Sequence, residues 1–273
     1  MTIHHLRGVL ERLKTKGPDI IFFRGISLLG DVYPQLGDRR MLDVDILVRE
    51  RDLALLKKVL ETLGLEEIEP GVFCKTGFVL DVHTSFLTPI RSTLGKSCFT
   101  ISLEEVFQRS IPKQLDDIEI KIPCPAHLFI TTAFHLQSHS FDSQKGWEDL
   151  IRIKDYYRLS NEEILSEAKR MGAERTLYYL SYLRPELFSD WKQKLSFGER
   201  IILKRILNGR SNANFGDLLF LFRSKRKVKA LQEIFFPQGI SWSIIVNRLQ
   251  KTLLLLRTIL FGSTARVIKK HRP

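Results

Sequence analysis

The chain has 273 residues, of which 44% are hydrophobic and 27% are charged, and this composition is typical of a soluble globular chain with one core, or one core and a smaller helical companion. The formal net charge is +12, and three widely spaced cysteines, at positions 74, 98 and 124, favour reduced thiols over a disulfide scaffold. No secretory signal is recognised at the N-terminus, and the uncharged stretch 234–247 is too short to span a membrane, so a cytoplasmic protein is expected.

The first predicted elements are a helix, a buried strand and a turn. Apolar residues recur at helical spacing over residues 2–16, and Gly17-Pro18 ends this helix. The apolar run 20–23 predicts a buried strand, and Gly25 begins the turn that leaves it. A short helix is expected over residues 27–33.

The next strand, predicted over residues 41–48, carries two carboxylates. Leu42, Val44, Ile46 and Val48 alternate there with Asp43 and Asp45. Because alternate residues of a strand point to the same side, we expect one apolar face and one face that presents both acids. Two adjacent carboxylates repel each other unless a cation lies between them.

Further elements complete an α+β part. A helix is predicted over residues 52–63, with Asp52 as its N-cap and Gly64 after its end. Two strands, 72–75 and 78–83, are joined by a turn at 76–77, and another strand is expected over 116–122. The predicted fold is therefore α+β, a small mixed β-sheet flanked by helices.

After Pro123 the pattern becomes helical to the end of the chain. Helices are predicted over residues 127–141, 147–159 and 162–171, the last capped by Asn161, and no β alternation follows. We therefore expect two domains, an α+β domain over residues 1–122 and a helical domain over residues 123–273.

Three aspartates are the candidate catalytic and metal-binding residues. Asp81 lies within the apolar run 78–83 and joins Asp43 and Asp45 as a third acid on a later strand. Such carboxylates suit two Mg²⁺ ions, with Mn²⁺ as a substitute, which would bind a triphosphate and activate an attacking hydroxyl.

Residues near the acids in the sequence are candidates for contacts with a nucleotide. Gly25 allows close approach of the backbone, Ser27 offers a hydroxyl, and arginines pair with phosphate oxygens. The six candidates are Arg24, Gly25, Ser27, Arg39, Arg40 and His83. His83 could donate a hydrogen bond from behind the acids or be a metal ligand, but a partly buried, hydrogen-bonded histidine is slightly favoured. Lys154 is a weaker candidate for a nucleotide contact.

Three further histidines lie in the first predicted helix after Pro123. His135 and His139 are four residues apart, but no acid or cysteine accompanies them in a zinc pattern. We expect these two and His127 to pack between the helices and the sheet.

The excess positive charge is confined to the last third of the chain. Residues 191–273 contain 18 Lys and Arg against three acids, whereas the first 190 residues are slightly acidic. This asymmetry favours a polyanionic partner, RNA or DNA ahead of anionic lipid, over a basic face that binds nothing specific. The candidate phosphate contacts are Lys204, Arg205, Arg210, Arg223, Lys225, Arg226, Lys227 and Lys229.

Taken together, these motifs resemble the polymerase-β-type nucleotidyltransferase superfamily. They are most similar to a poorly characterised bacterial group of nucleotidyltransferases, through Arg24-Gly25, Tyr33-Pro34, the run from Arg39 to Val48, and Asp81-Val82-His83. The resemblance covers residues 20–90 well, with arginine at position 24 where lysine is usual and leucine at 42 where glycine is common. It implies a nucleotidyltransferase palm that transfers a nucleoside monophosphate from an NTP to an acceptor and releases pyrophosphate.

The acceptor is open at this stage. The basic last third favours RNA, most specifically a tRNA end, while a protein hydroxyl, a small molecule and a non-catalytic nucleotide-binding module are the alternatives. A membrane-bound C-terminal stretch around residues 251–270 ranks below simple helix packing. The sequence fixes neither the NTP nor the oligomeric state. Alanine at Asp43 or Asp45 is expected to abolish transfer and to leave the fold intact or slightly more stable.

Overall fold

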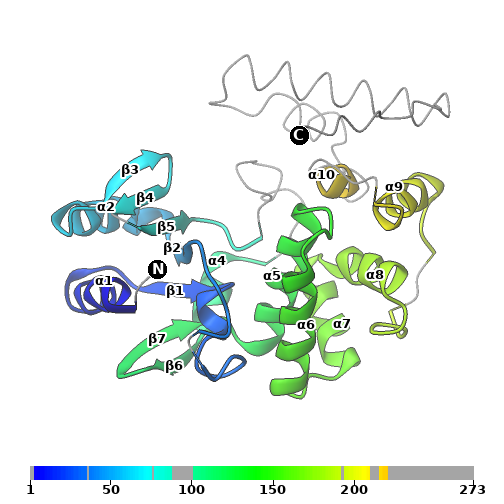
Figure 1. The fold of residues 1–273 in the computed structure, drawn as a ribbon, viewed down its shortest axis with the longest axis horizontal. Helices are drawn as coiled ribbons and strands as arrows, with labels where there is room; N and C mark the ends of the chain where they lie inside the picture. Colours follow the sequence, from blue (N-terminus) through cyan, green and yellow to red (C-terminus); the bar gives the residue numbers. More distant parts are fainter. Residues whose placement is uncertain are drawn as a thin grey trace, which may run out of the picture.

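The computed structural model describes residues 3–35, 37–75, 77–87, 101–191, 194–209 and 215–220. These residues form a five-stranded mixed sheet, a two-stranded antiparallel sheet and helices that cover and extend them (Figure 1). The α+β class predicted from the sequence is confirmed. Cys74 and Cys124 are free thiols, and Cys98 lies outside the described residues.

The larger sheet has the strand order β1-β2-β5-β4-β3. Its strands are β1 (Ile20–Phe23), β2 (Val44–Val48), β3 (Glu66–Glu69), β4 (Val72–Lys75) and β5 (Phe78–His83). β2 lies between β1, to which it is antiparallel, and β5, to which it is parallel. Because β2 is an interior strand, all five of its residues are buried.

The strand expected over residues 41–48 is shorter than predicted. β2 begins at Val44, so Asp43 immediately precedes the strand and Leu42, expected on the apolar face, is 85% exposed. The reason is pairing, because the partner strands reach only Asp45 from β1 and Val44 from β5. Asp45 lies within the strand and is only 6% exposed.

Helices α1 (Ile3–Lys16) and α2 (Leu53–Thr62) pack beside this sheet. The predicted helices 2–16 and 52–63 agree with them to within one residue at each described end. Asp52 does occupy the N-cap position of α2, but its side chain makes no capping hydrogen bond. The helix expected over residues 27–33 is reduced to a single 3₁₀ turn, η1 (Ile26–Leu28).

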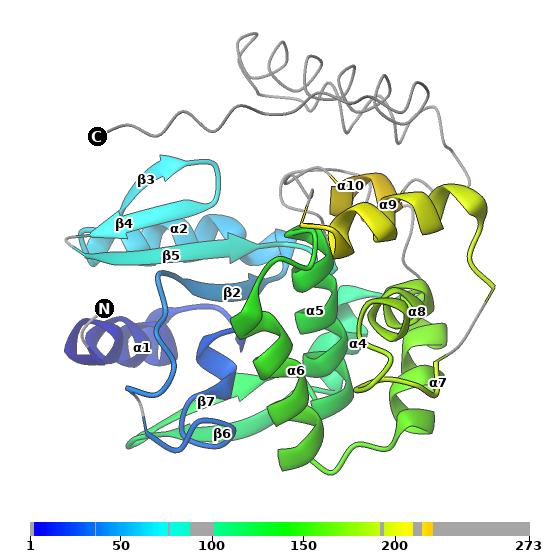
Figure 2. The same ribbon diagram turned by 45° about the vertical axis from the view of Figure 1, so that its right-hand side comes forward.

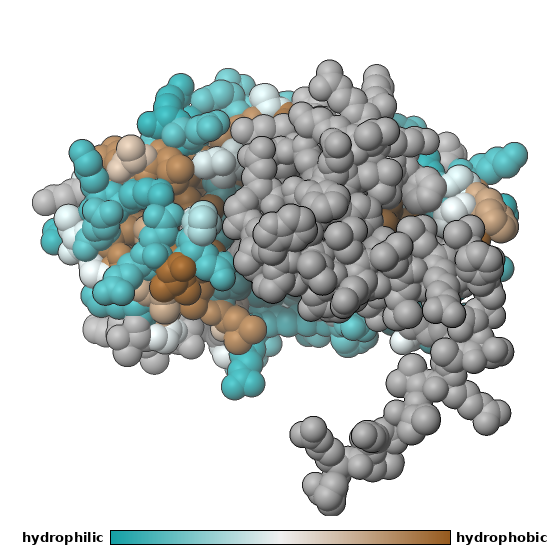
Figure 3. All heavy atoms as spheres, turned by 90° about the horizontal axis from the view of Figure 1, so that it is seen from above, coloured by the Kyte–Doolittle hydropathy of each residue, from teal (hydrophilic) through white to brown (hydrophobic). Residues whose placement is uncertain are grey.

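Three elements were not predicted. β3 escaped notice because all four of its residues are exposed, three of them glutamates, and it lies at an edge of the sheet. The surface over α2 and β3 is largely hydrophilic with scattered apolar side chains (Figure 3). The other two elements are α4 (Leu103–Gln108) and β6 (Ile111–Leu115).

β6 forms a hairpin with β7 (Ile118–Ile122), and β7 packs beside β1. The strand expected over 116–122 is therefore confirmed from Ile118 onward, while Asp116 belongs to the turn and has a φ of 56°. Lys113 of β6 is buried, and its ammonium group contacts the Asp31 carboxylate at 3.1 Å and the Ser27 carbonyl at 2.9 Å. The hairpin thus supports the turn that follows β1.

The rest of the described chain is helical, as predicted. The helices are α5 (Pro125–Ser138), α6 (Gln144–Tyr156), α7 (Asn161–Met171), α8 (Glu174–Leu183), α9 (Phe197–Leu207) and α10 (Phe215–Phe220). α5 is buried on nearly all sides and contacts α6, α7, α8 and α10 (Figure 2). The cap of α7 is Ser160, which forms a capping box with Glu163, and not Asn161.

The α+β and helical parts are joined by ion pairs as well as apolar contacts. Arg39, before β2, pairs with Asp149 of α6, and Arg109, after α4, pairs with Glu167 of α7. Among the described residues, no helix has the length and apolar character that crossing a bilayer requires.

Candidate active site

Two acids lie side by side at the centre of the larger sheet. The parallel register of β2 and β5 pairs Asp45 with Asp81, so both side chains project to the same side. His83, two residues after Asp81, projects there too, and its Nε2 lies 2.9 Å from Asp45 Oδ1 and 3.3 Å from Asp81 Oδ2. One ligand atom from each of these three residues lies within 4.8 Å of the others.

Asp43 approaches the same place from the segment before β2. It is exposed, and it lines the same cavity as Asp45 and Asp81. Partial desolvation raises the pKa of Asp43, and the negative charges of Asp45 and Asp81 raise it further. The compact three-residue cluster in the described part of the chain is therefore Asp45, Asp81 and His83, with Asp43 beside it.

Arg24 supplies the positive charge that the acids face in this structure. Its Nη1 donates to Asp45 Oδ1 at 2.6 Å and lies 3.5 Å from His83 Nε2. Burial opposes ionisation of Asp45, but the charge of Arg24 and the hydrogen bond from His83 prevail and lower the pKa of Asp45 to about 2. Arg24 has a φ of 57°, and the Ser27 hydroxyl donates to its carbonyl at 2.7 Å.

This contact defines the role of Ser27 in the structure. Ser27 is fully buried and is absent from the cavity lining, because its hydroxyl is turned back to the Arg24 carbonyl. The Ser27 hydroxyl, which was expected to contact a nucleotide, therefore does not face the cavity in this structure. The side chain instead holds Arg24 in its left-handed conformation.

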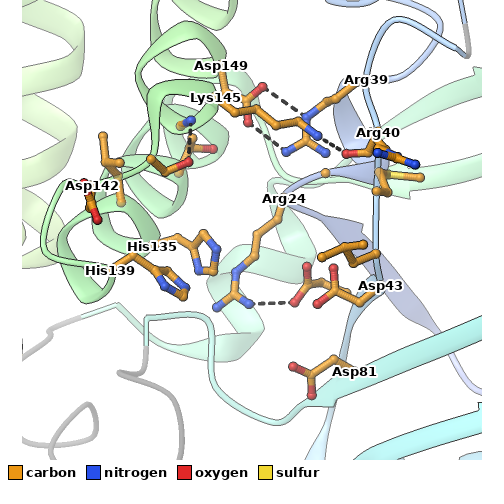
Figure 4. Close-up of a pocket in the computed structure, with 18 of the residues that line it drawn as sticks. Arg24, Arg39, Arg40, Asp43, Asp81, His135, His139, Asp142, Lys145 and Asp149 are labelled. Atoms are coloured by element: carbon orange, nitrogen blue, oxygen red, sulfur yellow. Dashed lines mark hydrogen bonds and ion pairs between the residues drawn. The ribbon is translucent and has the colours of Figure 1, made fainter. Parts of the chain in front are cut away.

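The acids open into a cavity of about 620 Å³ between the sheet and helices α5 and α6. Figure 4 shows Asp43 and Asp81 at one end, and Arg39, Arg40 and Lys145 gathered near Asp149 at the other. Of the predicted nucleotide-binding residues, Arg24, Gly25, Arg39 and Arg40 line this cavity, whereas His83 lies behind the acids.

Arg39 is held by an acid that sequence reasoning missed. Its Nε and Nη2 donate to the two carboxylate oxygens of Asp149 at 3.0 and 2.7 Å, and the Tyr33 hydroxyl donates to Asp149 at 2.8 Å. Burial and the Asp149 carboxylate strongly raise the pKa of Tyr33, so it stays a neutral donor. Asp149 lies 110 residues from Arg39, and no local pattern connects the two.

Lys145 is the second missed residue. It lines the cavity one turn before Asp149 on α6, whereas Lys154, the lysine of this helix noted from sequence, does not line it. The sequence feature that could have indicated Lys145 is its i, i+4 spacing from Asp149, which places both residues on one side of α6.

The histidines of α5 separate into two groups. His127 is fully buried, and its Nε2 bonds to Glu167 Oε1 of α7 at 2.5 Å. His135 and His139 instead line the cavity, with ring centroids 4.5 Å apart. Burial and the charge of Arg24 lower the pKa of both, so they are neutral at pH 7. In the described ranges neither belongs to a group of three metal-binding side chains.

The predicted phosphate contacts of the last third are mostly not described. Lys204 and Arg205 lie on α9, exposed and partly exposed, and outside the cavity lining. The others, Arg210, Arg223, Lys225, Arg226, Lys227 and Lys229, fall outside the described residues, as does the amphipathic stretch 251–270.

The acid cluster fits a divalent cation. Carboxylate oxygens are the ligands that hard divalent cations prefer, and an imidazole nitrogen is compatible with several of them. The three ligand atoms of Asp45, Asp81 and His83 already lie close enough to surround one ion without movement of the strands. Arg24 holds one of these oxygens, so a cation would compete with the Arg24–Asp45 ion pair.

Comparison with known proteins gives one family and several distant structures. A family model described as "Uncharacterised nucleotidyltransferase" matches residues 1–189. No curated protein matches the chain.

Among solved structures, the antibiotic-resistance factor ANT(2'')-Ia in solution is 13% identical, with a TM-score of 0.44 over 67% of this chain and 96% of its own. The same factor in complex with adenylyl-2''-tobramycin is 11% identical, with a TM-score of 0.42 over 60% and 93%. An antigenic nucleotidyltransferase-like protein from Paracoccidioides brasiliensis is 16% identical, with a TM-score of 0.42 over 72% and 97%. These similarities are too low to assign a residue or a substrate to this chain.

Proposed function

The chain belongs to the nucleotidyltransferase family whose model covers residues 1–189, and from this we propose that it transfers a nucleoside monophosphate from an NTP to an acceptor hydroxyl in a reaction that requires divalent cations. The observation that carries the proposal is the pairing of Asp45 with Asp81 across β2 and β5, at one end of a cavity that Asp43 also lines. Three carboxylates in one place are tolerable neighbours chiefly when cations bind between them.

The proposed roles of the acids follow from their positions. Asp43, Asp45 and Asp81 would hold two cations, Mg²⁺ or Mn²⁺, and Asp81 would also help hold the acceptor hydroxyl, with His83 supporting Asp45 and Asp81 from behind. Bound cations supply the positive charge that activates the hydroxyl and neutralises the phosphates. The acceptor hydroxyl gives up its proton to the Asp81 carboxylate that helps hold it, and its oxygen forms a bond to the α-phosphorus. The bond from that phosphorus to the oxygen bridging the α- and β-phosphates breaks, and pyrophosphate leaves. The residues of the chain act mainly by position and charge.

For the acceptor we retain RNA, most specifically a tRNA end, as the leading proposal. It is supported by the 18 basic residues against three acids over residues 191–273. It is also supported by the docking of α10 beside the cavity, where the Gly216 amide donates to the Ser140 hydroxyl at 3.0 Å and Ser140 lines the cavity. The last described helix before the basic segment therefore lies beside the cavity.

A small-molecule hydroxyl is the second candidate. A cavity of about 620 Å³ lies within the range of pockets that enclose small ligands. The test is incubation with NTPs labelled at the α-phosphate and, separately, total RNA, lysate protein or a panel of small alcohols and sugars. We expect label in RNA and none with the Asp45→Asn variant. Label in small molecules alone would transfer the proposal to that acceptor, and no transfer with any NTP would refute it.

If RNA is the acceptor, its affinity should fall steeply as salt rises, because bound cations are released from the phosphate backbone. Affinity that does not depend on salt would remove the nucleic-acid proposal and leave the catalytic one intact.

A further inference from the structure

One end of the cavity gathers cationic side chains that come from two distant parts of the chain. Arg39 and Arg40 precede β2, and Lys145 comes from the first turn of α6. The ammonium group of Lys145 donates to the Arg40 carbonyl. Partial burial, followed by the charge of Arg39, lowers the pKa of Lys145. The positively charged groups at this end therefore lie close enough to repel one another, and a bound anion would relieve that repulsion.

The acids at this end only partly balance these charges. Asp149 is buried, and its carboxylate is committed to Arg39 and to the Tyr33 hydroxyl. Asp142 lines the cavity but is exposed. Glu148 of α6 pairs with Arg152 of the same helix at 2.8 Å. Lys145 and Arg40 have no ion pair within 4 Å in the described part of the chain.

The Asp149 carboxylate fixes the direction of the Arg39 guanidinium. Both the Nε and the Nη2 of Arg39 are used by Asp149, and the side chain is 12% exposed. The remaining donor group, Nη1, lies over Gly25, which also lines the cavity. Arg39 is thus held by α6 with one donor group directed toward the turn after β1.

Gly25 provides the space for this donor. A methyl group at Gly25 would collide with Arg39 Nη1 and would lie 3.2 Å from both Arg39 Cζ and Met41 Sδ. Its φ of −51° is ordinary for any residue, so glycine is needed for space rather than for backbone conformation. The glycine turn, the arginine before β2 and the aspartate of α6 form one assembly.

We propose that α6 completes a polyphosphate subsite, in which Lys145 and Arg39, with Arg40 beside them, bind the β- and γ-phosphates of the NTP and the pyrophosphate that leaves, while Asp149 is a positioning residue for Arg39. The proposal rests on the proposed function and extends it. The two ends of the cavity are complementary to a metal-bound triphosphate (Figure 4). The acids at one end would bind the cations, and the basic side chains at the other end would bind the phosphate charges that the cations do not neutralise.

The direct test is the binding of inorganic pyrophosphate in the presence of Mg²⁺, followed by calorimetry without NTP or acceptor. We expect Lys145→Met to weaken this binding by about tenfold, the usual order for one charge-assisted hydrogen bond. Lys154→Met is the matched control, because it removes a lysine of the same helix that does not line the cavity, and it should bind as the wild type does. The subsite is refuted if the wild type fails to bind pyrophosphate, or if Lys145→Met binds it equally well.

The positioning role of Asp149 needs a readout that loss of stability would not produce. In transfer assays we expect Asp149→Asn to raise the KM for NTP by more than it lowers kcat, and Tyr33→Phe, which keeps the Arg39–Asp149 pair, to have a much smaller effect. Equal effects of the two variants on KM would overturn this role. If no NTP is transferred but Lys145→Met still loses pyrophosphate binding, the proposed function fails and the subsite stands. If transfer occurs and the Lys145→Met variant has an unchanged KM, the subsite fails alone.

Discussion

Asparagine at Asp43 and asparagine at Asp45 should have the same effect on catalysis and opposite effects on stability. Both variants are expected to lose nucleotidyl transfer, because each removes a carboxylate assigned to the cations. They differ in the cation-free fold, since Asp45 is 6% exposed and pairs with Arg24 at 2.6 Å, whereas Asp43 is exposed and lies near two like charges. The sequence alone led us to expect no loss of stability from either change.

The magnitude for Asp45 follows from its pKa. The value is lowered from 3.8 to about 2, and at about 1.4 kcal/mol for each pKa unit the ionised carboxylate is stabilised by roughly 2 to 3 kcal/mol. The Arg24 side chain is 10% exposed, and its Nε already has no hydrogen-bond partner. Breaking one partner of a buried ion pair costs about 3 to 5 kcal/mol. We therefore expect Asp45→Asn to lower the free energy of unfolding by about 2 to 4 kcal/mol.

The assay is urea unfolding at pH 7 with a chelator present, so that no bound cation contributes. Asp43→Asn is the matched control and should be neutral or slightly stabilising, because desolvation and the charges of Asp45 and Asp81 already disfavour its ionised form. If the two variants have equal stability, or if Asp43→Asn is the less stable of the two, the Arg24–Asp45 ion pair does not stabilise the fold as we expect.

Three further outcomes are expected. Glu199→Gln should lower the free energy of unfolding by about 3 kcal/mol, because Glu199 is fully buried and accepts from Arg175 at 2.8 Å and Tyr179 at 2.6 Å; Glu163→Gln, in an equivalent but exposed capping box, should change it far less in the same urea titration. Gly216→Ala should lower the thermal midpoint, since a methyl group there would overlap the Gln137 carbonyl, whereas Gly8→Ala, with open space around it, should not. A carboxylate with a lowered pKa stabilises the fold above its unfolded pKa and loses that contribution as pH falls, so the wild type should lose its Asp45 contribution between about pH 4 and pH 2, and the difference in unfolding free energy from Asp45→Asn should shrink over that interval.

Much of the fold was accessible from sequence because its signals are local. β1, β4 and β5 are apolar runs bounded by glycine or proline turns, and their predicted limits match the structure. The predicted helices after Pro123 were displaced by only a few residues. β6 was missed because Pro112 and Lys113 interrupt the apolar alternation that is typical of a strand. Lys113 is buried because it contacts Ser27 and Asp31, and these contacts cannot be read from the sequence.

The residues of the site likewise fall into those with a local sequence signal and those that depend on how distant elements pack. Asp45 and Asp81 could be assigned to one site from sequence because both lie in apolar runs that predict strands. The structure adds that these strands are parallel neighbours whose register places the two acids opposite each other. Asp149 and Lys145 could not be assigned, because their relation to Arg39 and Arg40 depends on how α6 packs against the sheet, across more than 100 residues. The buried Arg24–Asp45 pair likewise depends on a left-handed residue at position 24.

Binding of Mn²⁺, followed by electron paramagnetic resonance with a non-hydrolysable NTP analogue present, measures whether the acids hold the cations. We expect two bound ions in each chain, with binding lost in Asp45→Asn and strongly weakened in Asp81→Asn, while Lys154→Met binds as the wild type does. Absence of Mn²⁺ binding in the folded wild type, or unchanged binding in both aspartate variants, would contradict this expectation.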